Sequence, residues 1–153
     1  MVIIYILRCS QNKWYVGKTN HLFSRIENHM NGKFRVPQWC KKYPPIDVEK
    51  FYLNCDDFDE DKYTKIYMSI YGIMNVRGGS YSGVKLPKMT LKFLENEIKG
   101  AANKCYYCGS DDHFAKTCPK RKIKKRRKCG RCGRIGHNRT RCYAKTHFNG
   151  NSL

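Results

Sequence analysis

Short apolar runs separated by polar turns dominate the first part of the chain, a pattern that predicts a small α+β domain. Residues 2–9 (VIIYILRC) and 14–18 (WYVGK) are rich in β-branched and aromatic residues, and the turn-forming residues between them indicate a hairpin. A third strand is expected over residues 47–55. Together these segments predict a three-stranded antiparallel sheet.

Three helices are predicted to flank this sheet. The first begins at Thr19 or Asn20 and runs to about residue 31, and the third covers residues 90–99. The second covers residues 59–71 and is expected to bury a stripe of residues at helical spacing, namely Tyr63, Ile66, Tyr67, Ile70 and Tyr71.

The remaining segments of this part are expected to be irregular. Residues 33–46 are basic and interrupted by prolines, which favours a loop with a short helical turn. Residues 75–84 are rich in glycine and are expected to lack regular structure. Gly100 is expected to end the third helix.

Composition changes abruptly after residue 100, where apolar periodicity ends and Cys, His, Gly, Lys and Arg dominate. We therefore expect one folded domain followed by two small cysteine–histidine modules. The expected divisions are a domain over residues 1–100, a linker over 101–104, a first module over 105–118, a basic linker over 119–128, a second module over 129–142 and a tail over 143–153.

The charge of the chain indicates a polyanionic partner. Lys and Arg number 31 against 12 acidic residues, which gives a formal net charge of +19. Residues 104–153 hold 15 of the basic residues and only two of the acidic ones. An excess of this size favours nucleic acid, because it raises the local concentration of polyphosphates. No amphipathic stretch accompanies the charge to suggest a membrane surface.

The beginning of the chain carries no pattern typical of a signal peptide. The apolar run over residues 2–7 is short and lacks a basic segment before it. We expect an intracellular protein, in the nucleus or cytoplasm of a eukaryotic cell, and a viral origin fits the domain combination.

Two cysteine–histidine repeats with identical spacing are the strongest signal in the sequence. Three thiolates and one imidazole fill a tetrahedral Zn²⁺ shell with no open position, so both sites are expected to be structural. The odd total of nine cysteines also favours metal over a disulfide framework. The predicted ligands of the two zinc ions are Cys105, Cys108, His113 and Cys118, and Cys129, Cys132, His137 and Cys142.

The repeats resemble the zinc knuckles of retroviral nucleocapsid proteins, and this resemblance implies binding of unpaired bases. In the first repeat Tyr107 and Phe114 are candidate stacking residues, with Tyr106 beside them. The second repeat has Ile135 and no aromatic between its outer ligands, so its stacking role is expected to be weaker. The basic run between the repeats is a candidate phosphate-binding segment, a nuclear localisation signal or a solvated charge run. Its basic residues are Lys120, Arg121, Lys122, Lys124, Lys125, Arg126, Arg127 and Lys128.

Several side chains of the first domain are expected to converge on one surface. Tyr5 and Tyr15 lie ten residues apart, as expected for facing strands around a short turn. Arg25 and His29 are four residues apart and therefore project from one face of their helix. Glu60 is in line with the apolar stripe of the second helix, which is an unusual place for a solvated acid.

These residues resemble, in order and spacing, the GIY-YIG nuclease family, which includes phage homing endonucleases and the incision subunit of bacterial excision repair. The resemblance covers residues 1 to about 85. Residues 3–5 (IIY) resemble the first motif, with Ile in place of the family glycine, and residues 15–17 (YVG) resemble the second, with Val for Ile. The site residues carried over by position are Tyr5, Tyr15, Gly17, Arg25, His29, Glu60 and Asn75.

The resemblance implies metal-dependent hydrolysis of a phosphodiester. Glu60 would hold one Mg²⁺ or Mn²⁺ ion that keeps most of its waters. Tyr5 would help to accept the proton of the attacking water, with Tyr15, Lys18 or His29 lowering its pKa.

The other motif residues would support this chemistry. Arg25 would neutralise charge on the non-bridging phosphate oxygens, and Gly17 would allow close packing of a strand against a helix near the phosphate. Asn75 closes the motif set or ties down the glycine turn after it, and Asp59 is an alternative metal ligand to Glu60.

Structural roles stay open beside these functional ones. The tyrosines suit strand positions, the arginine suits a helix surface, and an acid in the first turn of a helix complements the helix dipole. Cys9, Cys40 and Cys55 are interpreted as small core residues. The sequence therefore predicts an endonuclease, with DNA favoured over RNA and cleavage guided by substrate structure. The alternative is a nucleic-acid-binding or chaperone protein whose nuclease-like domain is inactive.

Overall fold

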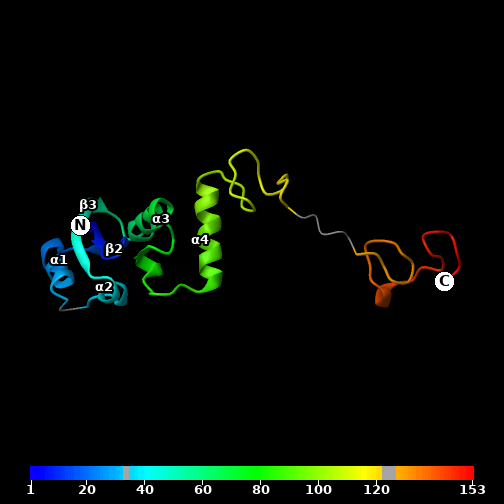
Figure 1. Cartoon of the computed structure of the whole chain (residues 1–153), viewed down its shortest axis with the longest axis horizontal. Coiled ribbons are helices and arrows are strands. Elements are labelled where there is room, and N and C mark those ends of the chain that lie inside the picture. Colours follow the sequence, from blue (N-terminus) through cyan, green and yellow to red (C-terminus); the bar gives the residue numbers. More distant parts are fainter. Residues whose placement is uncertain (33–34, 122–126) are drawn as a thin grey trace.

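The computed structural model describes residues 1–32, 35–121 and 127–153 (Figure 1). The α+β class is confirmed, because strands and helices follow one another up to Ala101. The elements are β1 (Val2–Cys9), β2 (Lys13–Thr19), α1 (Leu22–Met30), α2 (Gln38–Lys42), β3 (Pro45–Cys55), α3 (Asp59–Tyr71), β4 (Val76–Gly78), the 3-10 turn η1 (Gly79–Tyr81), α4 (Lys88–Ala101) and the 3-10 turn η2 (Arg139–Arg141).

The sheet has four strands in the order β3-β1-β2-β4. Strand β1 pairs antiparallel with both neighbours, so that Tyr5 lies opposite Gly17 on β2 and opposite Phe51 on β3. Strand β4 pairs parallel with β2. The prediction of a three-stranded antiparallel sheet was therefore wrong. The fourth strand, VRG, is too short to show alternation, and it lies in the segment where the glycines had indicated irregular structure.

The helices differ from the predicted ones mainly at their ends. Helix α3 has the predicted bounds, whereas α1 begins at Leu22 because the hydroxyl of Thr19 accepts a hydrogen bond from the N–H of His21 outside the helix. Helix α2 and the first residues of β3 occupy the end of the predicted loop 33–46. Helix α4 begins at Lys88 and continues past Gly100, which had been expected to end it.

The buried face of α3 agrees with the predicted stripe in part. Tyr63, Tyr67 and Tyr71 pack in the core as predicted. Ile66 and Ile70 are 41% and 63% exposed, and Thr64 and Met68 are buried in their place. Helix α3 packs on β2 and β4, where Thr64 lies against the glycine backbone of Gly78. A close approach of this kind favours a small side chain over the larger isoleucines.

Two apolar clusters lie on opposite faces of the sheet. One joins side chains of β1 and β2 to α3 and α4, and its buried members include Ile4, Ile6, Trp14, Val16, Tyr67, Met68 and Leu94. The other joins the same strands to α1 and α2, and its members include Tyr5, Leu7, Cys9, Tyr15, Leu22, Ile26, Trp39 and Cys40. Cys9 and Cys40 are thus core residues as predicted, whereas Cys55 is half-buried. The second cluster positions the candidate site, because it fixes both tyrosines against α1.

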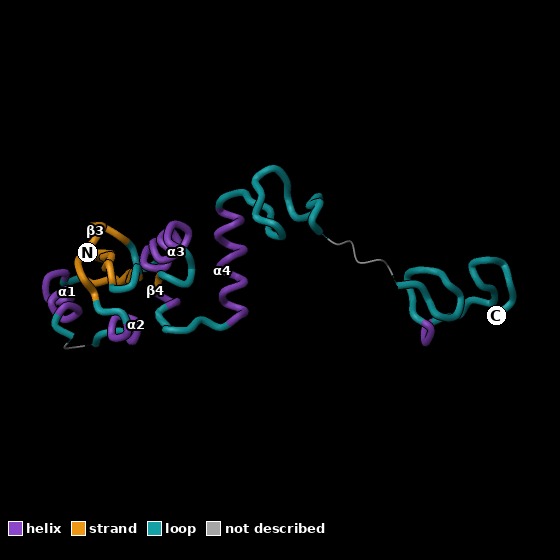
Figure 2. The backbone as a smooth tube through the Cα atoms, viewed as in Figure 1, coloured by secondary structure: helices purple, strands orange, loops and turns teal. Residues whose placement is uncertain are grey.

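Beyond α4 the described chain is almost entirely loop, as the tube in Figure 2 shows. Within the described ranges, no helix has the length and apolar character needed to cross a membrane.

Candidate active site and zinc sites

The phenol of Tyr5 lies at the centre of a buried hydrogen-bonded group. Its oxygen is 2.8 Å from Nε2 of His29 and accepts a hydrogen bond of 3.1 Å from Nε of Arg25. With Arg25 donating to the phenol oxygen, the Tyr5 hydroxyl can donate its own proton to His29 Nε2. In that tautomer the imidazole proton is on Nδ1, a buried nitrogen with no hydrogen-bond partner among the described residues.

Burial controls the protonation of both partners. Burial raises the pKa of Tyr5 to about 12, although the nearby Arg25 charge lowers it. The pKa of His29 is lowered to about 4, first by burial and then by Arg25. At neutral pH the pair is therefore a neutral phenol and a neutral imidazole. The sequence had suggested Tyr15, Lys18 or His29 as the group that lowers the pKa of Tyr5. Arg25 lowers it instead, and burial outweighs this effect.

Tyr15 and Gly17 complete the aromatic part of this group. The Tyr15 ring lies 6.4 Å from the Tyr5 ring and 5.5 Å from the imidazole of His29, and burial raises its pKa. A β-carbon at Gly17 would overlap the Cζ and Oη atoms of Tyr5. The close approach at Gly17 is thus to a tyrosine on the neighbouring strand, whereas the sequence had suggested packing of a strand against a helix.

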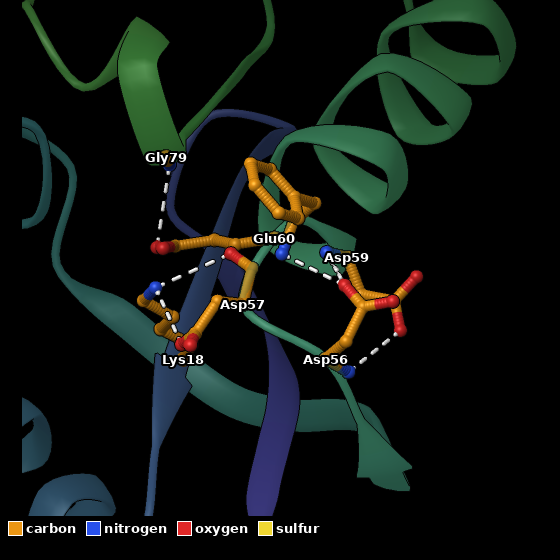
Figure 3. Close-up of polar contacts among 7 residues, drawn as sticks. Lys18, Asp56, Asp57, Asp59, Glu60 and Gly79 are labelled. Carbon is orange, nitrogen blue, oxygen red and sulfur yellow. Dashed lines mark hydrogen bonds and ion pairs between the residues drawn. The ribbon is translucent and has the colours of Figure 1, made fainter.

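Glu60 projects from the first turn of α3 toward the backbone N–H of Gly79 (Figure 3). One carboxylate oxygen accepts a 3.3 Å hydrogen bond from the N–H of Gly79. Burial raises the pKa of Glu60, and the Lys18 charge opposes this shift. The negative charge of Glu60 in turn raises the pKa of both Tyr5 and Tyr15, so the carboxylate lies within electrostatic reach of the two phenols.

The neighbouring acids have structural contacts. Asp59 accepts hydrogen bonds from the N–H of Asp56 and from the ammonium of Lys62, and it points away from Glu60 (Figure 3). Asp56 in return accepts hydrogen bonds from the N–H groups of Phe58 and Asp59, which begin α3 and would otherwise lack partners within the helix. Asp57 forms an ion pair of 3.2 Å with Lys18. Of the two candidate metal ligands, Glu60 and not Asp59 is therefore the one whose charge acts on the two tyrosines.

The structure does not bring Asn75 to this group. Its amide donates to the carbonyl of Tyr71 and accepts a 2.6 Å hydrogen bond from Lys13, while its carbonyl accepts from the N–H of Trp14. Asn75 thus joins the end of α3 to the start of β2. Gly17 lies near the opposite end of that strand.

Sequence reasoning missed two contributors to the site. The N–H of Gly79 binds Glu60. The glycines indicated a turn at this position, but the contact of its backbone with Glu60 has no sequence signal. Arg77 is buried with its guanidinium 4.6 Å from the Trp39 ring, and it donates to the carbonyls of Ile73 and Gly83. These bonds hold the chain on both sides of β4, which bears Gly79 at its end.

The two predicted zinc sites are formed in the structure. Cys105, Cys108, His113 and Cys118 bring one ligand atom each to within 4.8 Å of one another, and Cys129, Cys132, His137 and Cys142 do the same. This arrangement of three sulfurs and one nitrogen fits tetrahedral Zn²⁺. Although burial opposes it, backbone hydrogen bonds lower the pKa of the Cys105 thiol to about 6, which favours the thiolate that zinc requires.

The predicted nucleic-acid contacts are exposed where the structure describes them. Tyr107 and Phe114 are 54% and 66% exposed in the first repeat. Tyr106 is 51% exposed, but its hydroxyl lies against Gly100 of α4. Four members of the basic run are exposed, namely Lys120, Arg121, Arg127 and Lys128. The other four, Lys122, Lys124, Lys125 and Arg126, lie outside the described residues.

Comparison with known families finds a similarity for each part of the chain. Residues 1–62 match the GIY-YIG catalytic domain, and residues 103–120 match the zinc knuckle. The first part is thus similar to the catalytic domain of a nuclease superfamily, and the first repeat is similar to a module associated with nucleic-acid binding. The match to the knuckle does not extend to the second repeat or to nucleocapsid proteins in particular.

Two curated relatives share the N-terminal part. A UPF0213 protein of Bacillus cereus is 31% identical over 67 residues, which are 44% of this chain and 62% of the relative. The UPF0213 protein YazA of Bacillus subtilis is 45% identical over 29 residues, which are 19% of this chain and 29% of the relative. The chain therefore spans less than two thirds of the length of either relative. No solved structure matches the chain.

Proposed function

We propose that this chain is a metal-dependent endonuclease that hydrolyses phosphodiester bonds in DNA and selects its substrate by structure. In this proposal the first domain cuts, and the two zinc modules bind single-stranded or distorted nucleic acid beside the cut.

The observation that carries the proposal is the contact between Tyr5 and His29 in the presence of Arg25 and Glu60. A phenol, an imidazole and a guanidinium are joined by hydrogen bonds, with the first two buried, and the Glu60 carboxylate lies within electrostatic reach of the phenol. A buried tyrosine could fill the core without such partners. Its hydrogen bonds to a base and to a cation instead suit proton transfer beside an anionic substrate.

The geometry supports a proton relay. The attacking water gives its proton to the phenol oxygen of Tyr5 as the Tyr5 hydroxyl proton passes to Nε2 of His29, 2.8 Å away. With a pKa of about 12, Tyr5 does not act as a standing phenolate at neutral pH. The low pKa of His29 keeps its imidazole neutral and able to accept the proton.

Arg25 is placed to stabilise the charge that develops on the phosphate. Its guanidinium is half-exposed and directed by its bonds to the Tyr5 oxygen and to the carbonyl of Arg35. A guanidinium has five N–H donors, so these two contacts leave the group able to bind phosphate oxygens. Preorganised donors of this kind contribute most when the negative charge increases in the transition state.

Glu60 suits a hydrated divalent cation. Among the described residues, groups of three or more potential ligands occur only at the two zinc sites, so Glu60 would contribute a single carboxylate. Mg²⁺ is commonly bound by one or two carboxylates and several waters. A bound Mg²⁺ or Mn²⁺ would polarise the scissile phosphate and stabilise the leaving oxygen.

The test is a cleavage assay with zinc-loaded protein, with and without Mg²⁺ or Mn²⁺. Labelled single strands, duplexes, flaps and branched junctions would be compared, in DNA and in RNA. We expect cutting that requires the divalent cation and is strongest on DNA with unpaired regions. Tight binding without cutting on every substrate would contradict the proposal and favour a nucleic-acid-binding protein.

A further inference from the structure

The segment after the second zinc site folds back onto that site. The N–H of Phe148 donates a 2.9 Å hydrogen bond to the carbonyl of Cys132, a zinc ligand, and Arg134 bonds the hydroxyl of Thr146. Within the segment, Thr146 pairs with Ser152 and the N–H of Leu153 donates to the carbonyl of Lys145. Residues 143–153 thus form a hairpin attached to the second module.

Packing around Gly133 shows that the hairpin fits this module closely. A β-carbon at Gly133 would overlap the Phe148 ring and lie 2.8 Å from Nε2 of His147. The corresponding glycine of the first repeat, Gly109, has no atom within 4 Å of such a β-carbon. Both glycines have positive φ, 72° and 80°, so they differ in their surroundings and not in their backbone. The first repeat therefore lacks the cover that Phe148 gives the second.

The hairpin supplies the ring that the second repeat lacks between its ligands. Phe148 packs at 4.6 Å from the His147 ring and nevertheless stays 56% exposed. Lys128 precedes Cys129, the first ligand of the second zinc site, and has its ammonium 5.4 Å from the Phe148 ring centre. An exposed ring with a cation beside it suits a nucleotide, because the base stacks and the phosphate meets the charge.

We propose that the second zinc module extends to residue 153 and binds an unpaired base on Phe148, with Lys128 and Arg134 beside the nucleotide phosphates. This proposal revises the expectation that the second repeat stacks bases more weakly than the first. In the proposal its stacking ring is Phe148, which lies in the segment after its last ligand, Cys142. This inference rests on the proposed nucleic-acid binding but not on cleavage.

The test is binding of the full zinc-loaded chain to single-stranded oligonucleotides of DNA and of RNA, without Mg²⁺ so that cleavage has no influence. Phe148→Leu keeps an apolar side chain over Gly133 but removes the ring. We expect about tenfold weaker binding of single strands and little change for duplex, since stacking on one aromatic contributes on this order. Zinc content is measured for each variant.

Two further variants separate stacking from folding. Gly133→Ala is expected to displace the hairpin and weaken single-strand binding, whereas Gly109→Ala imposes the same backbone strain without displacing it. In Phe148→Trp, a base stacked on the added indole is expected to quench its fluorescence. Trp14 and Trp39 are buried in the first domain, so the change in fluorescence reports on the added indole.

The outcomes are distinct. Wild-type affinity in Phe148→Leu with zinc retained, or an unquenched indole in Phe148→Trp, would overturn the inference while leaving the proposed function intact. Equal losses in Gly133→Ala and Gly109→Ala would overturn it as well. A wild-type chain that binds no nucleic acid would contradict both the inference and the proposed function.

Discussion

Tyr5 and His29 are 24 residues apart, yet the phenol oxygen of the one lies 2.8 Å from Nε2 of the other in the core of the first domain. The sheet holds the tyrosine and α1 holds the histidine, so packing between the two elements fixes the contact. Arg25 donates to the same oxygen, so the tyrosine joins a cation and an imidazole through one atom.

Removing the Tyr5 hydroxyl should stop cleavage without unfolding the domain. Tyr5→Phe keeps the buried ring but removes the atom that receives the proton of water. We expect the single-turnover cleavage rate to fall at least about 100-fold, as for loss of a general base. Tyr71→Phe is the matched control, since its hydroxyl bonds Glu49 on the other face of the sheet. Equal rates for Tyr5→Phe and wild type would exclude the relay.

The lowered pKa of His29 predicts that acid destabilises the first domain. Its pKa falls from an ordinary 6.5 to about 4 on folding, so between these values the unfolded chain binds the proton more strongly. The contribution of neutral His29 to the free energy of unfolding should therefore be fully present above pH 6.5. It should decrease by up to about 3 kcal/mol as the pH falls to about 4.

Denaturant titrations of wild type and His29→Asn at several pH values would measure this effect. Tryptophan fluorescence is a suitable probe, because Trp14 and Trp39 both lie in the first domain. Acid release of zinc affects both proteins alike, so the difference between them isolates His29. A difference that does not change between pH 7 and pH 4 would contradict the prediction.

A single methyl group at Gly17 should disturb the site. In Gly17→Ala the β-carbon overlaps the Tyr5 phenol, which must move away from His29 or force the strands apart. We expect a loss of about 1–3 kcal/mol in unfolding free energy together with loss of cleavage. Gly83→Ala is the control, because its β-carbon would have ordinary contact with the Lys85 carbonyl at 3.5 Å. Two variants of equal stability and activity would show that Gly17 has no such role.

The elements with clear periodicity were predictable from the sequence, and those made by tertiary contacts were not. Helix α3 has the predicted bounds because its long pattern of aromatic and polar residues ends at Gly72. Strand β4 has three residues, and its pairing with β2 depends on packing beneath α3. Periodicity placed the tyrosines of α3 correctly in the core but not Ile66 and Ile70, since the close contact of Thr64 with Gly78 has no sequence signal.

The site shows the same division. Zinc ligands repeat at fixed spacing along the chain, so their grouping was predictable and the structure forms it. Lys18, Gly79 and Arg77 contribute through the turn after β4 and the ion pair with Asp57, which only the folded chain brings together. The hairpin over Gly133 was not predictable either, because residues 143–153 have no periodic pattern.

Binding should depend steeply on salt, because basic side chains of the C-terminal part displace counterions from phosphates. Exposed Lys120 and Arg121 each should add about one unit to the slope of log affinity against log salt. Replacing both with Gln is expected to reduce the slope by about two while leaving zinc content unchanged. A titration from low to physiological salt measures this, and an unaltered slope would remove these residues from phosphate binding.

Glu60 tests the central claim most directly, with its neighbour Asp59 as the control. Wild type, Glu60→Gln and Asp59→Asn would be compared on the best-cleaved substrate in Mg²⁺, with binding measured alongside. The account predicts that Glu60→Gln binds as wild type does but does not cut, whereas Asp59→Asn cuts despite losing the negative charge that pairs with Lys62. Cutting by Glu60→Gln at the wild-type rate would contradict the account.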